Sequence, residues 1–190
     1  MKKLKVDIYN TNKKYNIIYA DPPWKYNDER QHYKIKGIAA KHYNTMPIED
    51  IKALGDVIQN ISADDSILFL WTTFPKLKEA IETIKSWGFT YKTLGFSWIK
   101  TNPKDGKPFF GIGYYTRSNC EVCLLATKGK ARNLIISNKE SSCIISEIQE
   151  HSKKPDETRH RINQLVGQVP KIELFARQEV DGWDSWGNEI

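Results

Sequence analysis

The stretch Tyr15-Asn16-Ile17-Ile18-Tyr19-Ala20-Asp21-Pro22-Pro23-Trp24 decides the fold, because a short apolar run passes directly into a rigid acidic turn. The apolar run predicts a buried strand, and the abrupt change of composition after it predicts a loop at the strand's carboxyl end. The chemistry of this chain is therefore expected where the strand stops.

The four residues after this strand are suited to hold a flat aromatic amine. Asp21 can accept a hydrogen bond from an exocyclic amino group. The prolines fix φ and lack an N–H, so the turn is stiff and the Pro22 carbonyl is left as a second acceptor. Trp24 offers a face on which a ring can stack. We predict a pocket for an aromatic amine here, with a plain turn beside a core tryptophan as the alternative.

Strand-like and helical segments alternate along the rest of the chain, which predicts an α/β fold with a mostly parallel sheet. Most of the strand candidates are near-continuous apolar runs, as expected when helices cover both faces of the sheet. The candidates span residues 15–20, 66–71, 94–100, 120–127, about 143–148, and 171–176.

Three helices have readable ends. Pro47 is predicted at the first position of one helix, with apolar residues at helical spacing from Ile48 to Ile58. A second helix is predicted from Pro75, with Leu77, Ala80, Ile81, Ile84 and Trp87 on one face and Gly88 at its end. A third helix is predicted from about Pro155 to Val166, ending at Gly167.

The composition is that of one globular domain over residues 1–190, with 39% hydrophobic and 27% charged residues. The net charge of +6 favours a polyanionic partner such as nucleic acid, although many basic proteins have no such partner. No apolar run approaches the ~20 residues of a membrane span, and the N-terminus lacks the apolar region of a signal peptide. We expect a cytoplasmic protein without a membrane segment.

The cysteines predict neither a disulfide framework nor a metal site. Cys120 and Cys123 form a single C-x-x-C within a strand-like run, and no second pair or nearby histidines complete a zinc set. Buried thiols in a reducing compartment are the prediction.

Two long segments, 26–42 and 101–117, interrupt the alternation of strands and helices. Loops of ~15 residues inside a compact domain are usually functional or mobile. Both are candidate walls of the pocket, with plain surface loops as the alternative.

Further motifs follow the first one in order along nearly the whole chain. They are Tyr43-Asn44-Thr45-Met46, Leu68-Phe69-Leu70-Trp71, Trp98-Ile99-Lys100-Thr101-Asn102, Lys154-Pro155-Asp156-Glu157, Lys171-Ile172-Glu173-Leu174-Phe175-Ala176-Arg177 and Gly187-Asn188-Glu189. With these motifs the chain resembles the DPPW-type N6-adenine methyltransferases, which are related to the catalytic subunit of the eukaryotic mRNA N6-adenosine methyltransferase. The resemblance implies a Rossmann-like, S-adenosylmethionine-dependent methyltransferase in permuted motif order, with one antiparallel strand in the sheet.

The resemblance also implies roles for individual residues. It makes Asp21, Pro22, Pro23 and Trp24 catalytic. The residues implied to bind the cofactor are Lys154, Phe175, Arg177, Asn188 and Glu189. Tyr43 is implied to bind the substrate, and Arg117 and Glu121, which lie beside the long segment 101–117, are further candidates for contact with the target nucleotide. No metal is implied.

Structural alternatives exist for several of these residues. Phe175 could pack in the core, Lys154 could be a solvated lysine before a helix, and Tyr43 could be a hydrophobic contact at a helix entry. Asp7 and Ile8 resemble a family element at the cofactor's adenine, but their spacing to Asp21 is shorter, so no role is carried over to them.

Methyl transfer to adenine needs the lone pair of a delocalised amine, and acceptors on both of its N–H bonds help to localise that pair. Asp21 and the Pro22 carbonyl are the expected acceptors. DNA is favoured over RNA as the target, and a homodimer or a heterodimer is left open. The competing hypotheses are a non-catalytic nucleic-acid-binding partner subunit, an RNA adenosine methyltransferase, and methylation of N4 of cytosine.

Overall fold

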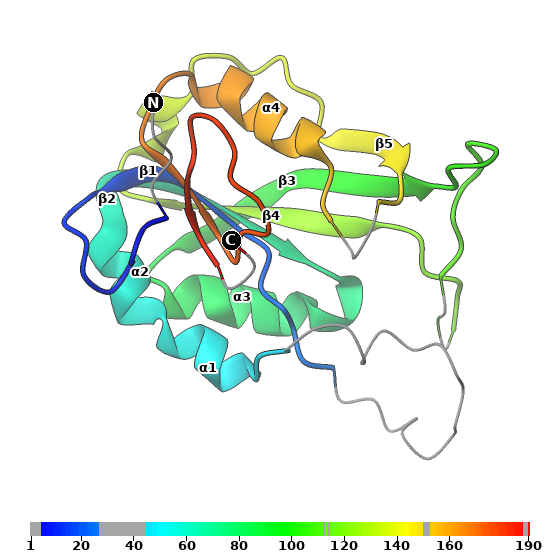
Figure 1. Cartoon of the computed structure of the whole chain (residues 1–190), viewed down its shortest axis with the longest axis horizontal. Helices are drawn as coiled ribbons and strands as arrows, with labels where there is room; N and C mark the ends of the chain where they lie inside the picture. Colours follow the sequence, from blue (N-terminus) through cyan, green and yellow to red (C-terminus); the bar gives the residue numbers. More distant parts are fainter. Residues whose placement is uncertain (1–4, 27–44, 112, 114, 150–152, 188–189) are drawn as a thin grey trace.

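A seven-stranded sheet with the order β5-β3-β4-β2-β1-β6-β7 lies between two layers of helices (Figure 1). The structure is a computed structural model that describes residues 5–26, 45–111, 113, 115–149, 153–187 and 190. The strands are β1 (Tyr15–Ala20), β2 (Ser62–Thr72), β3 (Thr90–Thr101), β4 (Glu121–Lys128), β5 (Cys143–Glu147), β6 (Lys171–Leu174) and β7 (Asp184–Trp186).

The directions of the strands confirm the prediction of a mostly parallel sheet with one antiparallel strand. β4 runs against both of its neighbours, β2 and β3, whereas the other paired strands are parallel. At the carboxyl end of β1, Ala20 pairs with Leu70 of β2 and Leu174 of β6. Three strand ends therefore meet beside Asp21, at the edge where α/β sheets bind their ligands.

Helices cover both faces of the sheet, as predicted. α1 (Ile48–Ala53), α2 (Gly55–Ile61) and α3 (Leu77–Ser86) lie on one face, and α4 (Asp156–Val166) with the short 3₁₀ helix η4 (Ala131–Leu134) lies on the other (Figure 1). Successive strand residues point to opposite faces. β1 accordingly gives Ile18 and Ala20 to the core under α1–α3, and Ile17 and Tyr19 to the core under α4.

The helix predicted after Pro47 is in fact two helices, which corrects the prediction. Pro47 is the N-cap of α1 and not its first helical residue, and α1 gives way to α2 at Leu54. A Cβ atom on Gly55 would lie 2.5 Å from the carbonyl oxygen of Ser86, so the start of α2 touches the end of α3 through backbone alone. The indole N–H of Trp87 donates to the carbonyl of Ile51 over 2.9 Å and fixes the end of α1.

The second predicted helix begins later than expected. Pro75 lies in a 3₁₀ turn, η3 (Phe74–Lys76), and α3 starts at Leu77. Ile81 was expected on the buried face, yet its side chain is 40% exposed, and Thr83 is buried instead. Gly88 and Gly167, the predicted ends of α3 and α4, do have positive φ.

The C-terminal part of the sheet also differs from the prediction. β6 ends at Leu174 and not at Ala176, because Phe175 has a φ of 59°, in the left-handed region that a strand cannot continue through. β7 was not predicted, since its three residues carry no pattern of their own and depend on pairing with β6. None of the described helices is both long and apolar enough to cross a membrane.

Candidate functional site

The turn after β1 is held by backbone hydrogen bonds to the segment before α1. The N–H of Trp24 donates to the carbonyl of Pro22 over 2.9 Å, which closes the turn on itself. The N–H of Met46 donates to the carbonyl of Pro23 over 2.8 Å, and the N–H of Lys25 donates back to the carbonyl of Met46 over 3.1 Å. The Pro22 carbonyl thus has one acceptor position occupied and one left for a ligand, because a carbonyl oxygen has two lone pairs.

Trp24 forms part of the wall beneath this turn. Its side chain is 7% exposed and packs in the core under α1–α3. Its indole N–H donates to the carbonyl of Trp71, the penultimate residue of β2, over 3.1 Å. This bond fixes the ring to the end of β2, and the stacking of a base on Trp24 stays a prediction.

Asp21 is paired with a buried lysine that comes from far along the chain. The Lys154 ammonium lies 2.8 Å from Asp21 Oδ2 and 3.1 Å from Glu121 Oε2. The ammonium of Lys100 forms an ion pair with the other oxygen of Glu121. Carboxylates and cations therefore alternate along a row that begins at the end of β1, passes through the segment before α4 to β4, and ends on β3. We call Asp21, Lys154, Glu121 and Lys100 the charge chain.

The charge chain is largely removed from water. The exposed fractions of the Asp21, Lys154 and Glu121 side chains are 20%, 9% and 12%. Burial alone would raise the pKa of Glu121, but the ammonium groups of Lys154 and Lys100 hold it below its ordinary value. Burial alone would lower the pKa of Lys154, but Asp21 and Glu121 raise it above its ordinary value. Glu121 and Lys154 are thus charged at neutral pH.

Aromatic rings lie under both cations of the charge chain. Lys154 Nζ lies 5.8 Å from the centroid of the Trp71 ring, and Lys100 Nζ lies 5.0 Å from that of the Trp98 ring. The Trp71 indole N–H donates to the hydroxyl of Tyr19 over 2.8 Å, so the ring under Lys154 is itself fixed from β1.

The end of β6 supplies a second group of residues beside Asp21. Phe175 turns the chain out of the sheet with its positive φ, and its ring packs edge-on against Trp186 at a centroid distance of 5.4 Å. The N–H of Ala176 donates to the carbonyl of Trp186 over 2.9 Å. A Cβ atom on Gly187 would lie 2.2 Å from the Ala176 carbonyl oxygen, so the two chain segments touch through backbone here. Strained residues at strand ends are common in ligand sites.

A buried ion pair fixes α4 to β6 and was not predicted. Both oxygens of Glu173 accept from Nη1 of Arg159, at 3.1 and 3.0 Å, and Arg159 also binds Asp156. Burial raises the pKa of Glu173 to about 7, against the opposing effect of Arg159. A glutamate inside the otherwise apolar run Ile172–Leu174 was the available sequence signal. Since charges are rarely buried without a partner, it indicated one.

The structure brings together some of the predicted site residues and leaves others apart. Asp21, Lys154 and Glu121 meet in the charge chain, and Phe175 lies at the neighbouring strand end. Arg117 is exposed in the segment before β4 and makes no ion pair with the charge chain. Tyr43, Asn188 and Glu189 lie outside the described residues.

Lys100 and Trp71 also belong to the site, although no role was predicted for them. Both lie in motifs of the resemblance, which was the signal available. The described residues include no cluster of side chains that could hold a metal ion, and their three cysteines are free.

Chemically, this edge of the sheet offers acceptors for an amine beside a cation. Asp21 Oδ2 binds Lys154, while Oδ1 accepts no hydrogen bond from the described residues. A free carboxylate oxygen and a free carbonyl lone pair on neighbouring residues can bind the two hydrogens of one amino group.

Known proteins share this sequence over most of its length. A family model described as MT-A70 matches residues 15–189. The type II methyltransferase M.MunI of a Mycoplasma species is 36% identical over 94% of this chain and 78% of its own length. The human N(6)-adenosine-methyltransferase catalytic subunit METTL3 is 29% identical over 93% of this chain, and a Drosophila melanogaster MT-A70-like N(6)-adenosine-methyltransferase is 31% identical over 93%.

The matched regions differ in how much of each relative they represent. The chain spans 28% of the length of METTL3 and 27% of that of the Drosophila protein, but most of the bacterial methyltransferase. The family model, in contrast, covers nearly all of the chain described here, including both groups of residues at the site. This protein therefore belongs to the MT-A70 family.

Proposed function

We propose that this chain transfers a methyl group from S-adenosylmethionine to the exocyclic N6 amine of adenine in nucleic acid, with DNA as the preferred target. The observation that carries the proposal is the position of Asp21. Its free oxygen and the free lone pair of Pro22 lie at the carboxyl end of β1, in a chain of the MT-A70 family.

Asp21 and Pro22 would act on the target amine. Two acceptors on the N–H bonds favour a pyramidal nitrogen, whose lone pair can attack. Lys154 holds the Asp21 carboxylate in place through Oδ2 and leaves Oδ1 to face the amine. The proton that N6 loses can pass to Asp21 and then to solvent, since this carboxylate is one-fifth exposed.

The residues present fit S-adenosylmethionine at the ends of β1 and β6. Phe175 presents a ring at the strand end, whereas Lys154, which was expected at the cofactor's carboxylate, is bound by Asp21 and Glu121. The backbone contact at Gly187 brings the segment that leads to Asn188 and Glu189 against Ala176, beside Arg177. When bound, the cofactor supplies a methyl group on a sulfonium, so that a C–S bond breaks as the N–C bond forms and a neutral thioether leaves.

DNA is favoured because this chain is more similar to the type II methyltransferase of Mycoplasma than to the two relatives above that are named as adenosine methyltransferases. The identities are 36% against 31% and 29%, over nearly the same part of this chain. The proposal places the enzyme in the cytoplasm, supported by three free cysteines that suit a reducing compartment. The enzyme would act as a homodimer or together with a different subunit.

The test is transfer of labelled methyl from S-adenosylmethionine to duplex DNA, single-stranded DNA and RNA, followed by digestion to nucleosides. N6-methyladenine in DNA is the expected product. Asp21→Asn should lower the rate by about 100-fold or more, the scale seen for loss of one such hydrogen bond, while cofactor binding is largely kept. Asp56→Asn, at an exposed position of α2, is the matched control.

Three results would contradict parts of this proposal. Methylation of RNA alone would overturn the preference for DNA. Loss of cofactor affinity together with activity in Asp21→Asn would remove Asp21 from its role at the amine. Cofactor binding without transfer to any of the three nucleic acids would instead favour a non-catalytic subunit.

A further inference from the structure

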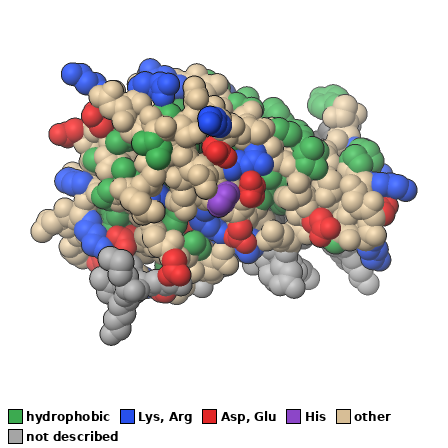
Figure 2. Space-filling view, turned by 90° about the horizontal axis from the view of Figure 1, so that it is seen from above, with side chains coloured by type: hydrophobic (Ala, Val, Ile, Leu, Met, Phe, Trp, Pro, Cys, Tyr) green, Lys and Arg blue, Asp and Glu red, His purple; other side chains and the backbone are tan. Residues whose placement is uncertain are grey.

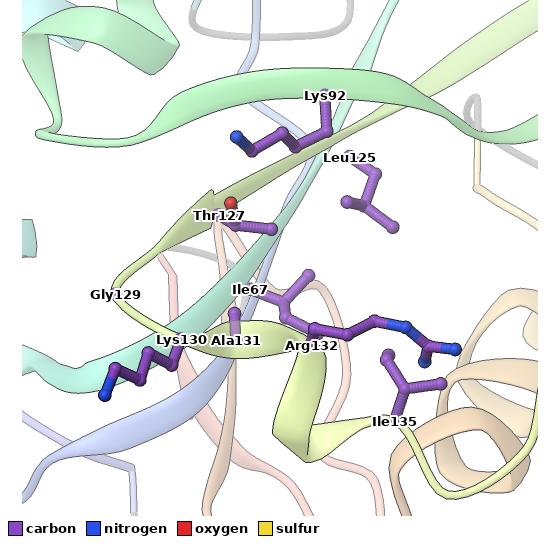
Figure 3. Close-up of a pocket in the computed structure, with 9 residues that line it drawn as sticks. All are labelled: Ile67, Lys92, Leu125, Thr127, Gly129, Lys130, Ala131, Arg132 and Ile135. Carbon is purple, nitrogen blue, oxygen red and sulfur yellow. The ribbon is translucent and has the colours of Figure 1, made fainter.

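A cavity of about 450 Å³ opens far from the charge chain, between β3, the end of β4 and η4 (Figure 3). It lies on the face of the sheet that carries α4, because Ile67 and Ala131 belong to the core on that side. Its volume is within the range of ~300–1,000 Å³ that is typical of ligand sites. The residues that line it are Ile67, Lys92, Leu125, Thr127, Gly129, Lys130, Ala131, Arg132 and Ile135. We call it the η4 groove.

The η4 groove has an apolar floor and a cationic rim. Ile67, Leu125 and Ala131 form much of the floor. In Figure 3 Lys92 extends over the groove from β3, and Arg132 runs along its other side towards Ile135, while Lys130 points outward. All three cations are exposed, and within the described part of the chain none of them forms an ion pair.

Nearby carboxylates do not neutralise this rim. Asp65 Oδ1 accepts from the backbone N–H of Lys130 over 2.6 Å and thereby shapes the turn at Gly129, where the carbonyl of Asp64 packs closely. Neither carboxylate is paired with Lys92 or Arg132. Viewed from the α4 side, Lys and Arg side chains project at this end of the molecule with some carboxylates among them (Figure 2). The side chains over the groove itself are positive.

The distance between the η4 groove and the proposed active site limits which kind of ligand could contact both. Glu121 begins β4 at the active edge, and Thr127 lies opposite Ile67 near the other end of the strand. At ~3.3 Å per residue, the six residue steps from Glu121 to Thr127 span about 20 Å. A single small molecule cannot reach this far, whereas about six base pairs of a duplex can, at ~3.4 Å each.

We propose that the η4 groove binds a phosphate-bearing part of the nucleic-acid substrate, several nucleotides from the adenine that is modified. Lys92 and Arg132 would contact backbone phosphates, and the apolar floor between them would accept a sugar or the face of a base. This inference rests on the proposed function, which supplies nucleic acid as the substrate. It adds a contact that does not depend on the loop residues 26–42 or 101–117.

The test compares two variants that each remove two positive charges. Lys92→Gln with Arg132→Gln alters the groove, and Lys78→Gln with Lys85→Gln alters exposed lysines of α3 on the opposite face. Binding of labelled duplex DNA is measured by fluorescence anisotropy between 50 and 200 mM salt. Each phosphate contact that is lost should reduce the magnitude of the slope of log K against log salt by about 0.9. The slope of the groove variant should therefore be smaller in magnitude than that of wild type by up to about 1.8. The α3 variant should keep the wild-type slope.

Methyl transfer to oligonucleotides of two lengths distinguishes this inference from the proposed function. The groove variant should raise KM at least several-fold for a duplex that extends ten or more base pairs from the adenine, with kcat unchanged. For a duplex that extends only three base pairs from the adenine, the KM of the groove variant should equal that of the wild-type protein. An unchanged salt slope, or equal losses on both lengths, would overturn the inference while leaving the enzyme intact. Failure of the wild-type protein to methylate or bind any nucleic acid would overturn both.

Discussion

Replacing Lys154 by Met is expected to destabilise this protein far more than the same change at Lys153. The Lys154 ammonium lies between two carboxylates, at 2.8 Å from Asp21 and 3.1 Å from Glu121. Without it, two largely buried carboxylates lose the cation that lies between them, and Lys100 still pairs with Glu121. Lys153, the preceding residue, forms an ion pair with Asp156 at the surface.

The magnitude follows from the burial of these groups. Breaking a buried ion pair by removing one partner costs about 3–5 kcal/mol. Since Asp21 is 20% exposed and can be partly rehydrated, we expect the low end, about 3 kcal/mol at pH 7. For a chain of 190 residues this lowers Tm by roughly 6–12 °C. Lys153→Met should cost at most about 1 kcal/mol, as expected for exposed pairs.

The pH dependence of the free energy of unfolding provides a second, independent test. In the wild-type protein Lys154 and Lys100 lower the pKa of Glu121, so this carboxylate stabilises the fold above its unfolded pKa and loses that contribution as pH falls. In Lys154→Met one of the two cations that oppose the effect of burial on the pKa of Glu121 is gone, so Glu121 should bind a proton more readily in the folded state than in the unfolded state. The variant should therefore regain stability between pH 7 and pH 5, and the gap to wild type should narrow.

The assay is chemical and thermal unfolding of wild type, Lys154→Met and Lys153→Met at several pH values. A cycle with Asp21→Asn should show that the Lys154 substitution costs at least about 1 kcal/mol less once Asp21 has lost its charge. Equal losses of unfolding free energy in the Lys153 and Lys154 variants would refute the alternating ion pairs of the charge chain. So would a difference in stability between wild type and Lys154→Met that grows as the pH falls.

Two further predictions concern the edge formed by β6. Because burial raises the pKa of Glu173 to about 7, the folded protein binds this proton more tightly than the unfolded chain. The wild-type free energy of unfolding should therefore fall relative to that of Glu173→Gln by about 2 kcal/mol as pH rises from 5 to 7, measured by urea unfolding. A wild-type free energy that stays constant or rises relative to the variant over this pH range would contradict the prediction. Gly187→Ala should cost about 1–3 kcal/mol and weaken cofactor binding measured by calorimetry, since the added Cβ would lie 2.2 Å from a backbone oxygen. Gly182→Ala is the control for cofactor binding: nothing lies within 4 Å of the added Cβ, and although the φ of 79° makes this change destabilising too, it should leave cofactor binding unchanged.

The sequence predicts the parts of this fold that depend on local pattern. Apolar runs locate β1 through β6 because a strand covered on both faces needs nearly every residue to be apolar. Gly88 and Gly167 locate two helix ends because only glycine takes positive φ without strain. The family resemblance adds that one strand of the sheet is antiparallel, and the structure shows that this strand is β4.

The remaining features depend on contacts between distant segments. The break at Leu54 follows from the contact of Gly55 with Ser86, and β7 forms only because β6 is there to pair with it. The pairing of Asp21 with Lys154 joins residues 133 positions apart. Residue types alone marked both as candidates, but only the folded sheet places one beside the other.

The two sides of the proposed site are not independent, because α4 is attached to both. Lys154 immediately precedes α4 and sets the charge next to Asp21, on the side of the target amine. Arg159, within α4, holds Glu173 one residue before the end of β6, on the side of the cofactor. A shift of α4 must therefore move the cation at Asp21 and strain the strand that leads to Phe175 together. The buried Arg159–Glu173 pair is in this way a positioning element for the acceptor Asp21 and for the cofactor-side turn at Phe175 at once.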